Sequence, residues 1–210
     1  MRITEPVTML TDYGLTILCT LCAWWLWKRG EEPGRWSVRS WALGFVTLGV
    51  ASLAGGAVHG LSLVLSAPIL KGLWKAAGLA VGISSSCFLI GPLFASVAPP
   101  LRQWLISLSC VQLLGYVVWM SLHDDFRYVI YNYGVTFAVI LVIQISSGIV
   151  RKRSSAGWIV AGVLVTCVAS VIQQSGFALH PSFNHNDLYH VIQMVGLSLL
   201  YRGSAQFQDR

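Results

Sequence analysis

Five ionisable side chains lie inside apolar segments or at their ends, where a membrane helix tolerates such groups least. They are Asp12 in TDYGL, His59 in AGGAVHG, and His185, Asp187 and His190 in FNHNDLYHVIQ. An ionisable group in a membrane helix is costly unless it is paired, hydrated or bound to a metal, so each one is a functional hypothesis by default. Their types, imidazole and carboxylate, are metal ligands and proton carriers.

The spacing of the last group indicates one shared helix face. Asp187 and His190 are three positions apart, and Asn186 and His190 are four apart, so these pairs lie on the same side of a helix. His185 falls in the helix cap region and can swing toward the same site. Gln193 follows His190 by about one turn, and we expect it to hydrogen-bond a ligand side chain.

Imidazole and carboxylate groups from separate helices, surrounded by an apolar wall, suit Zn²⁺ with an open position for water. The predicted ligands are His59, His190 and either His185 or Asp187. A water activated by zinc ionises near neutral pH, and Asp12 or Asp187 would accept its proton.

Structural roles are the alternative for each residue, because the spacing contains no strict motif such as HExxH. His59 would then bond a backbone carbonyl. Asp187 and His190 would form an N-terminal helix cap, and Asp12 would be an acid favoured by the helix dipole.

The composition of the whole sequence is typical of a membrane protein. The 210 residues are 55% hydrophobic and only 10% charged, and their mean hydropathy is +0.67. Runs long enough to cross a bilayer lie near residues 9–27, 41–66, 73–97, 103–122, 128–150, 156–178 and 187–202. These runs predict an all-α integral membrane protein: a single seven-helix transmembrane domain over residues 1–210, with short loops between antiparallel neighbours.

The distribution of basic residues predicts the orientation. Ten of the 14 Lys and Arg residues fall on one side of the predicted topology: Lys28, Arg29, Arg35, Arg39, Arg102, Arg151, Lys152, Arg153, Arg202 and Arg210. The other side has Arg2, Lys71, Lys75 and Arg127. The positive-inside rule then places the N-terminus outside and the C-terminus in the cytoplasm. The same rule explains the net charge of +6, so we expect membrane lipids as partners and no nucleic acid.

This topology puts all five ionisable residues at a similar depth in the outer leaflet, where helices one and seven begin and helix two ends. The pattern resembles the superfamily of seven-helix membrane hydrolases that includes alkaline ceramidases and the adiponectin and progestin receptors. The matching features are the helix count, Gly55-x-x-x-His59 late in helix two, and the His-bearing opening of helix seven, His185 to His190.

The resemblance implies that His59 and His190 are zinc ligands. The family has a second helix-seven His four residues before the other, a Ser one turn before the helix-two His, and an Asp in helix three. Here Asn186 and Gly55 occupy the first two positions, and helix three has Ser84, Ser85 and Ser86 but no Asp. We therefore expect a divergent, bacterial-type member in the cytoplasmic (inner) membrane.

The expected function is zinc-dependent hydrolysis of a lipid amide or ester, with the substrate entering between helices. The alternative is a non-enzymatic receptor, sensor or assembly protein that keeps a structural metal or a polar cluster. Two weaker alternatives are a haem held by His59 and His190 and a small transporter, although paired discontinuous helices are not evident.

Overall fold

The computed structural model describes residues 3–210. Arg2, which the orientation prediction counts, lies outside the described residues, and so does the side chain of Arg151. Helices make up 82% of the chain, and the described part has no strand. The prediction of an all-helical, seven-helix bundle is confirmed.

The helices run α1 Pro6–Arg29, α2 Trp36–Leu61, α3 Ala67–Ser96, α4 Pro99–Leu122, α5 Arg127–Arg151, α6 Ser154–Ser175 and α7 His185–Ser204. Six of them, α1 to α6, are long and apolar enough to cross a membrane. The more polar α7 packs along α6 and α1. The chain is thus a multi-pass integral membrane protein by the length and composition of its helices.

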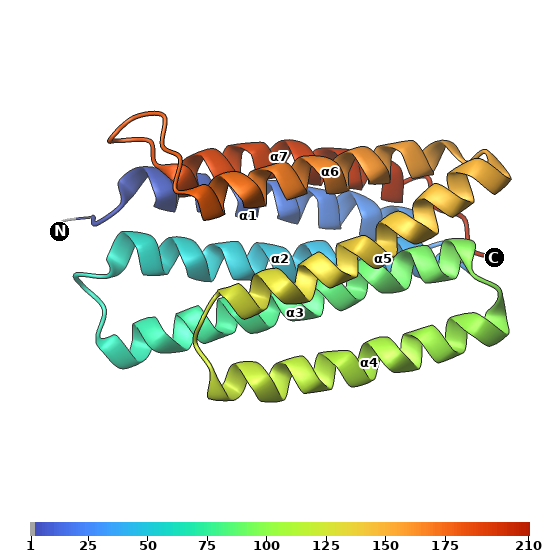
Figure 1. The fold of residues 1–210 in the computed structure, drawn as a ribbon, viewed down its shortest axis with the longest axis horizontal. Coiled ribbons are helices and arrows are strands. Elements are labelled where there is room, and N and C mark those ends of the chain that lie inside the picture. The colour runs from blue at the N-terminus through green and yellow to red at the C-terminus, as the bar shows by residue number, and fades with distance from the viewer. Residues whose placement is uncertain (1–2) are drawn as a thin grey trace.

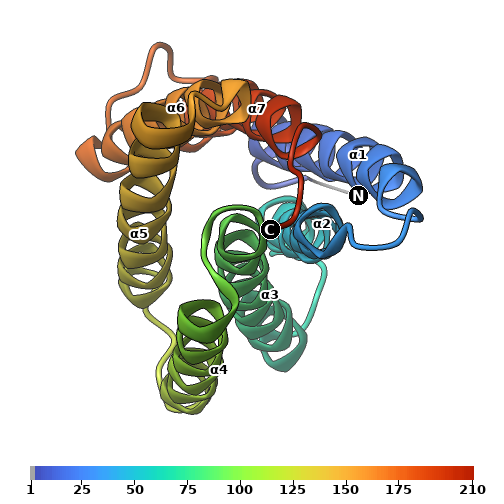
Figure 2. The same cartoon turned by 90° about the vertical axis from the view of Figure 1, so that its right-hand side faces the viewer.

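Six helices close into a ring. Each of α1, α2, α3, α5, α6 and α7 packs against the next in that order, and α7 returns to α1 (Figure 2). Helix α4 lies outside the ring against α3 (Figure 2). The first residues of α1, α3, α5 and α7 lie at one end of the bundle, which we call the histidine end. The opposite end carries the C-terminus, and we call it the basic end (Figure 1).

Local chemistry explains where the helices depart from the predicted bounds. Prolines stand in the first turns of α1, α3 and α4, where the missing N–H costs nothing, so these helices begin three to six residues earlier than expected. Helix α6 ends at Ser175 because Gly176 takes a left-handed conformation with φ +70°. Helix α2 spans 36–61 instead of 41–66, and a turn over 62–66 leads into α3.

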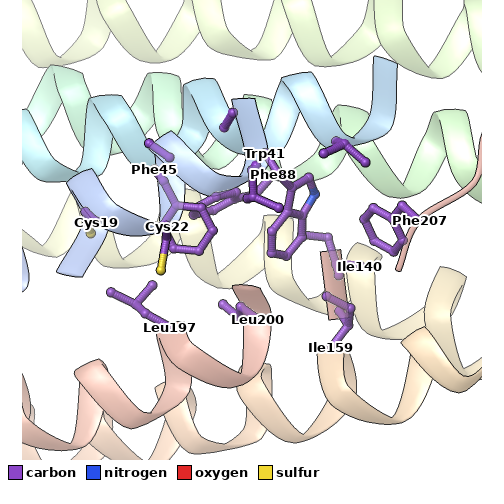
Figure 3. Packing of buried hydrophobic residues seen from close by; sticks show 14 of the residues in the cluster. Cys19, Cys22, Trp41, Phe45, Phe88, Ile140, Ile159, Leu197, Leu200 and Phe207 are labelled. Carbon is purple, nitrogen blue, oxygen red and sulfur yellow. The ribbon is translucent and has the colours of Figure 1, made fainter. Parts of the chain in front are cut away.

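The apolar core fills the half of the ring near the basic end. Trp41 and Phe45 of α2 pack on Phe88 of α3, with ring centroids 4.7 and 5.2 Å from that of Phe88 (Figure 3). Leu200 of α7 and Ile159 of α6 approach from the opposite side of the ring (Figure 3). These side chains come from several helices of the ring and make this half its most densely apolar part.

The C-terminal tail, residues 205–210, completes the core at the basic end. Phe207 is buried to 1% exposure and meets Trp41 edge-on, with the centroids 5.7 Å apart. Asp209 accepts hydrogen bonds from the backbone N–H groups of Trp36 (2.7 Å) and Ser37 (3.1 Å), and so caps the N-terminus of α2.

Three arginines, one beside each loop of the basic end, fasten the tail further. Arg35 donates to the Phe207 carbonyl at 2.9 Å, Arg153 to the Gln208 carbonyl at 3.1 Å and Arg102 to the Arg210 carbonyl at 2.8 Å. The tail therefore ties together the α1–α2, α3–α4 and α5–α6 connections. Some of the basic residues that predict the orientation of the chain in the membrane therefore also hold the tail in place.

Candidate functional site

A pocket of about 150 Å³ lies inside the ring in the half near the histidine end. Its walls come from α1, α2, α3, α6 and α7, with Phe126 before α5, and include Leu15, Leu48 and Val81. The polar side chains that line it are Asp12, Ser52, His59, Gln173, Asn186, Tyr189, His190 and Gln193. The structure thus brings together five of the predicted site residues: Asp12, His59, Asn186, His190 and Gln193.

His190 has both ring nitrogens directed at α1. Its Nδ1 lies 2.9 Å from the Thr11 hydroxyl, and its Nε2 lies 3.4 Å from Oδ1 of Asp12. The Thr11 hydroxyl lies 3.0 Å from the Thr8 carbonyl and can donate its hydrogen there. In the neutral tautomer that matches this arrangement, Nδ1 of His190 donates to Thr11 and the Nε2 lone pair faces the Asp12 carboxylate.

Two electron-rich atoms that face each other inside a bundle need a cation or a proton between them. A separation of 3.4 Å is long for a hydrogen bond from nitrogen to oxygen. It equals the distance of about 3.4 Å between two ligand atoms that each sit about 2.0–2.1 Å from one tetrahedral zinc. The geometry of Asp12 and His190 therefore suits two ligands of a common metal ion.

Asp12 is buried to 5% exposure, and its Oδ2 has no hydrogen-bond partner within residues 3–210. The carboxylate fits against α2 because Gly55 and Gly56 leave room: a Cβ on Gly55 would meet its two oxygens at 3.4 and 3.5 Å. A buried, unpartnered carboxylate oxygen is expensive. Asp12 is thus a ligand candidate, beyond its predicted role as a proton acceptor.

His59 reaches the pocket from α2 and is held by the segment before α1. Its Nδ1 lies 2.9 Å from Oε2 of Glu5, and the backbone N–H of Glu5 donates to the His59 carbonyl at 3.3 Å. A carboxylate on Nδ1 fixes the ring and directs the Nε2 lone pair away from Glu5, as in carboxylate–histidine–metal sites. The predicted alternative, a bond from the imidazole to a backbone carbonyl, is not the arrangement found.

Asp187 does not line the pocket and instead takes part in capping the start of α7. Its Oδ1 accepts from the Thr8 hydroxyl at 2.7 Å, and its Oδ2 accepts from the Asn184 backbone N–H at 2.7 Å. Asn184 accepts in return from the backbone N–H groups of Asn186 and Asp187, which completes a capping box at the start of α7. Each oxygen of Asp187 thus already accepts a hydrogen bond that holds the start of α7.

His185 is the first residue of α7 and does not line the pocket. Across the described chain, no group of three or more His, Cys, Asp or Glu side chains is already arranged to hold a metal ion. A metal ion bound by Asp12 and His190 would need a third ligand from a side chain that moves toward them. Among the histidines of the described chain, His59 is the other one that lines their pocket.

Two amides of the pocket also lack partners for their oxygens. Gln193 Oε1 and Gln173 Oε1 are buried without a hydrogen bond within the described chain, while the Gln173 amide nitrogen lies 3.5 Å from Asn186 Oδ1. Buried acceptors of this kind are normally satisfied by protein, water or a ligand. They make the pocket a place that favours hydrogen-bond donors and cations.

The loop between α4 and α5 differs from the pocket in that its charges are paired. Asp124 lies 2.6 Å from Lys75 Nζ and 3.1 Å from Lys71 Nζ. Hydrogen bonds from these two lysines, that from Lys75 first, lower the pKa of Asp124 below its ordinary range. Asp125 pairs with Arg127 in the same way, and its pKa is also lowered.

Comparison with known proteins places this architecture in a family. The model of the family of unknown function DUF6962 matches residues 7–209, nearly the whole described chain. The chain belongs to this family. No match was found among curated proteins or among solved structures.

The DUF6962 match contains Asp12, His59 and His190, together with Phe207 and Asp209 of the tail. Three residues that position the site were not predicted from the sequence: Glu5, Thr8 and Thr11. Thr8 and Thr11, two hydroxyl residues about one turn apart on α1 and next to Asp12, are the pattern that could have drawn attention to this face. Glu5 leaves no such pattern, because it precedes the helix.

Proposed function

We propose that this DUF6962 protein is a membrane hydrolase that binds one zinc ion through Asp12, His59 and His190 and cleaves an amide or ester of a membrane lipid. The observation that supports it most is the His190 Nε2–Asp12 Oδ1 distance of 3.4 Å, with the Nε2 lone pair facing a carboxylate. This revises the predicted ligand set, in which His185 or Asp187 took the place that Asp12 has here.

The donor set suits zinc. Two imidazoles and one carboxylate are the protein ligands of many catalytic zinc sites, which leave the fourth position open. Zinc held in this way makes a water molecule available as a nucleophile near neutral pH and polarises a carbonyl group. Protein side chains would orient the ligands, accept the proton of the water and bind the substrate head group.

Glu5 and Thr11 orient the two imidazoles, because each accepts from an Nδ1 and leaves the corresponding Nε2 free. Outer partners of this kind commonly raise metal affinity by about 10–100-fold. Asp12 Oδ2, which has no protein partner within the described chain, is placed to accept a proton from water. Gln173 and Gln193 present oxygens to hydrogen-bond donors of a substrate head group.

The shape of the pocket favours an amphiphilic substrate. A second cavity of about 60 Å³ shares Leu48, Val81 and Gln193 with the first and extends toward Phe88 and Phe137 in the core. A polar group among Asp12 and the histidines would therefore have a small, mainly apolar space beside it, whose lining also includes Ser84, Ser85, Tyr133 and Thr166. This agrees with the predicted lipid amide or ester and does not select between them.

Metal content tests the proposal. Protein purified in detergent without chelators is quantified by mass spectrometry for bound metals, as wild type and as Asp12→Asn, His59→Ala and His190→Ala. We expect about one zinc per chain in wild type and a loss of at least tenfold in each variant. His185→Ala is the matched control, because this histidine begins the same helix but does not line the pocket, and it should keep the zinc.

A monodisperse size-exclusion profile shows that each variant is folded before its metal is counted. Release of fatty acid from lipid amides and esters is then measured on the zinc-loaded protein. The proposal is contradicted if folded wild-type protein contains no metal. It is also contradicted if the variant that lacks both His59 and His190 contains as much zinc as wild type.

A non-enzymatic receptor or sensor is the second candidate, and one observation favours it. Three acceptor oxygens in or beside one pocket, Asp12 Oδ2, Gln173 Oε1 and Gln193 Oε1, lack partners within the described chain. A small ligand rich in hydrogen-bond donors would satisfy them without any metal. In that case folded wild-type protein carries no zinc, and an amphiphilic amine raises its melting temperature in wild type but not in Asp12→Asn.

A further inference from the structure

Helix α4 stands apart from the other six helices. It lies outside the ring and packs mainly against α3, while α5 runs away from it on a diagonal (Figure 1, Figure 2). Three of its residues, Ser109, Tyr116 and Met120, are buried. The rest of α4 is partly or fully exposed, so much of this helix faces the interior of the membrane.

One edge of α4 faces α5, and the two helices meet along it near the histidine end. There the ring of Trp119 meets that of Tyr128 edge-on, with the centroids 5.4 Å apart. The Gln112 amide of α4 donates a hydrogen bond to Oδ1 of Asn132 in α5. Gln112 and Trp119 are seven residues apart and therefore lie on the same side of α4.

Toward the basic end the two helices diverge and leave a hollow of about 330 Å³, which we call the α4–α5 groove. Its walls include Leu101 and Leu105 of α4 and Val142 and Val150 of α5, and Ser96 of α3 lies at its base. The groove is thus mainly apolar and continues the edge of α4 that carries Gln112.

The amide pair of Gln112 and Asn132 lies at membrane depth. Gln112 is exposed, about 20 Å from the start of α4 and about 15 Å from its end, which is within a hydrocarbon core about 30 Å thick. Within residues 3–210, the Oε1 of Gln112 and the Nδ2 of Asn132 have no hydrogen-bond partner. The pair keeps one free acceptor and one free donor whichever way the two amides are turned.

Acyl chains cannot satisfy these groups. They offer neither hydrogen-bond donors nor acceptors, and polar groups exposed to them are costly. Polar side chains of membrane helices commonly bond to a neighbouring helix instead. The free acceptor and donor of this pair therefore indicate a protein partner at this face.

Gly115 lies beside Gln112 on the exposed face of α4. A Cβ at this position would meet no atom of the chain within 4 Å, so no contact inside the molecule requires a glycine here. Glycine is a poor helix former, but in membrane helices it lets a second backbone come close. Leu108 and Val111 beside it are 63% and 64% exposed. Residues 103–122 carry no charged side chain, so two copies of this face would not repel each other.

We infer that α4 packs against α4 of a second copy of this chain, about a two-fold axis along the membrane normal, with Gln112 at the contact. Two copies with the same topology hold each residue at the same depth, so the axis brings one Gln112–Asn132 pair to the other. Each pair offers one donor and one acceptor, and two pairs therefore satisfy each other. A different partner would need a matching donor and acceptor at this depth, which a second copy supplies by symmetry.

The same symmetry gives the α4–α5 groove an occupant. Trp104 is 78% exposed and lies between Leu101 and Leu105 in the sequence. In the dimer, Trp104 of the second copy comes to the depth of the groove, whose apolar walls match an indole ring. The inference does not depend on the zinc site.

The test measures self-association of the full chain in liposomes. Energy transfer between donor-labelled and acceptor-labelled copies is followed as the ratio of lipid to protein is raised. We expect wild type to associate at low dilution and to dissociate in one transition that fits a dimer. Gln112→Leu/Asn132→Leu removes both amides together and leaves neither one unpaired inside the chain. It should raise the dissociation constant about tenfold, because the hydrogen bonds between the two copies are lost.

Gly115→Leu is an independent variant, because it adds bulk where the chain itself has room. It should keep the melting temperature of wild type and lose association at least as strongly. The matched controls are Gln174→Leu and Gly157→Leu, which change an exposed glutamine and an exposed glycine of α6. Both should associate as wild type does, and thermal unfolding shows that each variant is folded.

Two results would overturn the inference. The first is wild-type energy transfer no higher than random proximity gives at every dilution, which would mean that lipid or another protein covers this face. The second is association that is unchanged in both the double amide variant and Gly115→Leu, which would place the contact on another face of the bundle.

Discussion

The tail at the basic end and the pocket near the histidine end differ in how their polar groups are paired. At the basic end, the tail brings a carboxylate to the N-terminus of α2 and three carbonyls to three arginines, so these groups have partners, although the nearby Trp41 indole N–H has none within the described chain. In the pocket near the histidine end, Asp12 and Gln193 hold oxygens with no partner within the described chain. Unpaired buried acceptors are costly, so the pocket is where we place the proposed function, while the tail serves the fold.

The largest effect should come from the tail. Phe207→Ala removes a fully buried ring that meets Trp41, and we expect a loss of about 3–5 kcal/mol in the free energy of unfolding. Denaturant titration in mixed micelles measures it. Gln208→Ala is the control, because its side chain is exposed and its bonded carbonyl is kept; a loss as large in this variant would show that burial of the Phe207 ring is not the cause.

The cap on α2 should have an intermediate effect. Asp209→Ala leaves the N–H groups of Trp36 and Ser37 without their acceptor, and we expect a loss of about 1–2 kcal/mol. Zinc content should stay at the wild-type level, because the change is at the other end of the bundle. A simultaneous loss of zinc would mean that the two ends are coupled and that our division of roles fails.

In the pocket, replacing the buried carboxylate of Asp12 should lower the free energy of unfolding little or not at all. Asp12→Asn keeps the shape of the side chain and supplies an amide N–H that can donate to His190 Nε2. We expect the metal-free variant to be as stable as metal-free wild type, or more stable by about 1 kcal/mol. Chelated samples of both are compared by thermal unfolding, and a clear destabilisation of the variant would make Asp12 a structural residue.

The smallest effect concerns the exposed loop between α4 and α5. Lys75 and Lys71 lower the pKa of Asp124, so the ion pairs contribute stability above the ordinary aspartate pKa of about 3.9. That contribution is lost as the pH falls through the lowered pKa of the folded state. Asp124→Asn should therefore be slightly less stable than wild type at pH 7, and the difference should vanish in strong acid. A difference that is independent of pH would exclude the charge as its cause.

Hydropathy was sufficient to predict the six helices, α1 to α6, that are long and apolar enough to cross a membrane, because twenty apolar residues in a row have few other stable arrangements. The seventh predicted span is a helix, α7, but it is more polar than the other six. The same segments brought His59 and His190 to one pocket, since depth in the membrane follows from position in a helix. The helix ends were harder to predict. The start of α2 at Trp36 depends on Asp209, which is 173 residues away, and no local pattern records that contact.

The burial of the tail and the contacts of Asp187 escaped prediction for related reasons. Residues 205–210 contain one aromatic among polar residues, so they have neither the length nor the periodicity of a core element, and Phe207 is buried only because the ring of helices leaves a space for it. Asp187 was chosen as a ligand because it shares a helix face with His190. That face also meets Thr8 of α1, and there Asp187 takes part in the capping box of α7, the structural alternative for this residue.

The most direct test of the account is the visible absorption of the protein with cobalt(II) in place of zinc. A site with Asp12, His59 and His190 as ligands predicts the intense bands of tetrahedral cobalt in wild type and in His185→Ala, and their loss in Asp12→Asn and His59→Ala. Bands that persist in Asp12→Asn, or a folded wild-type protein whose spectrum is that of cobalt free in solution, would contradict it.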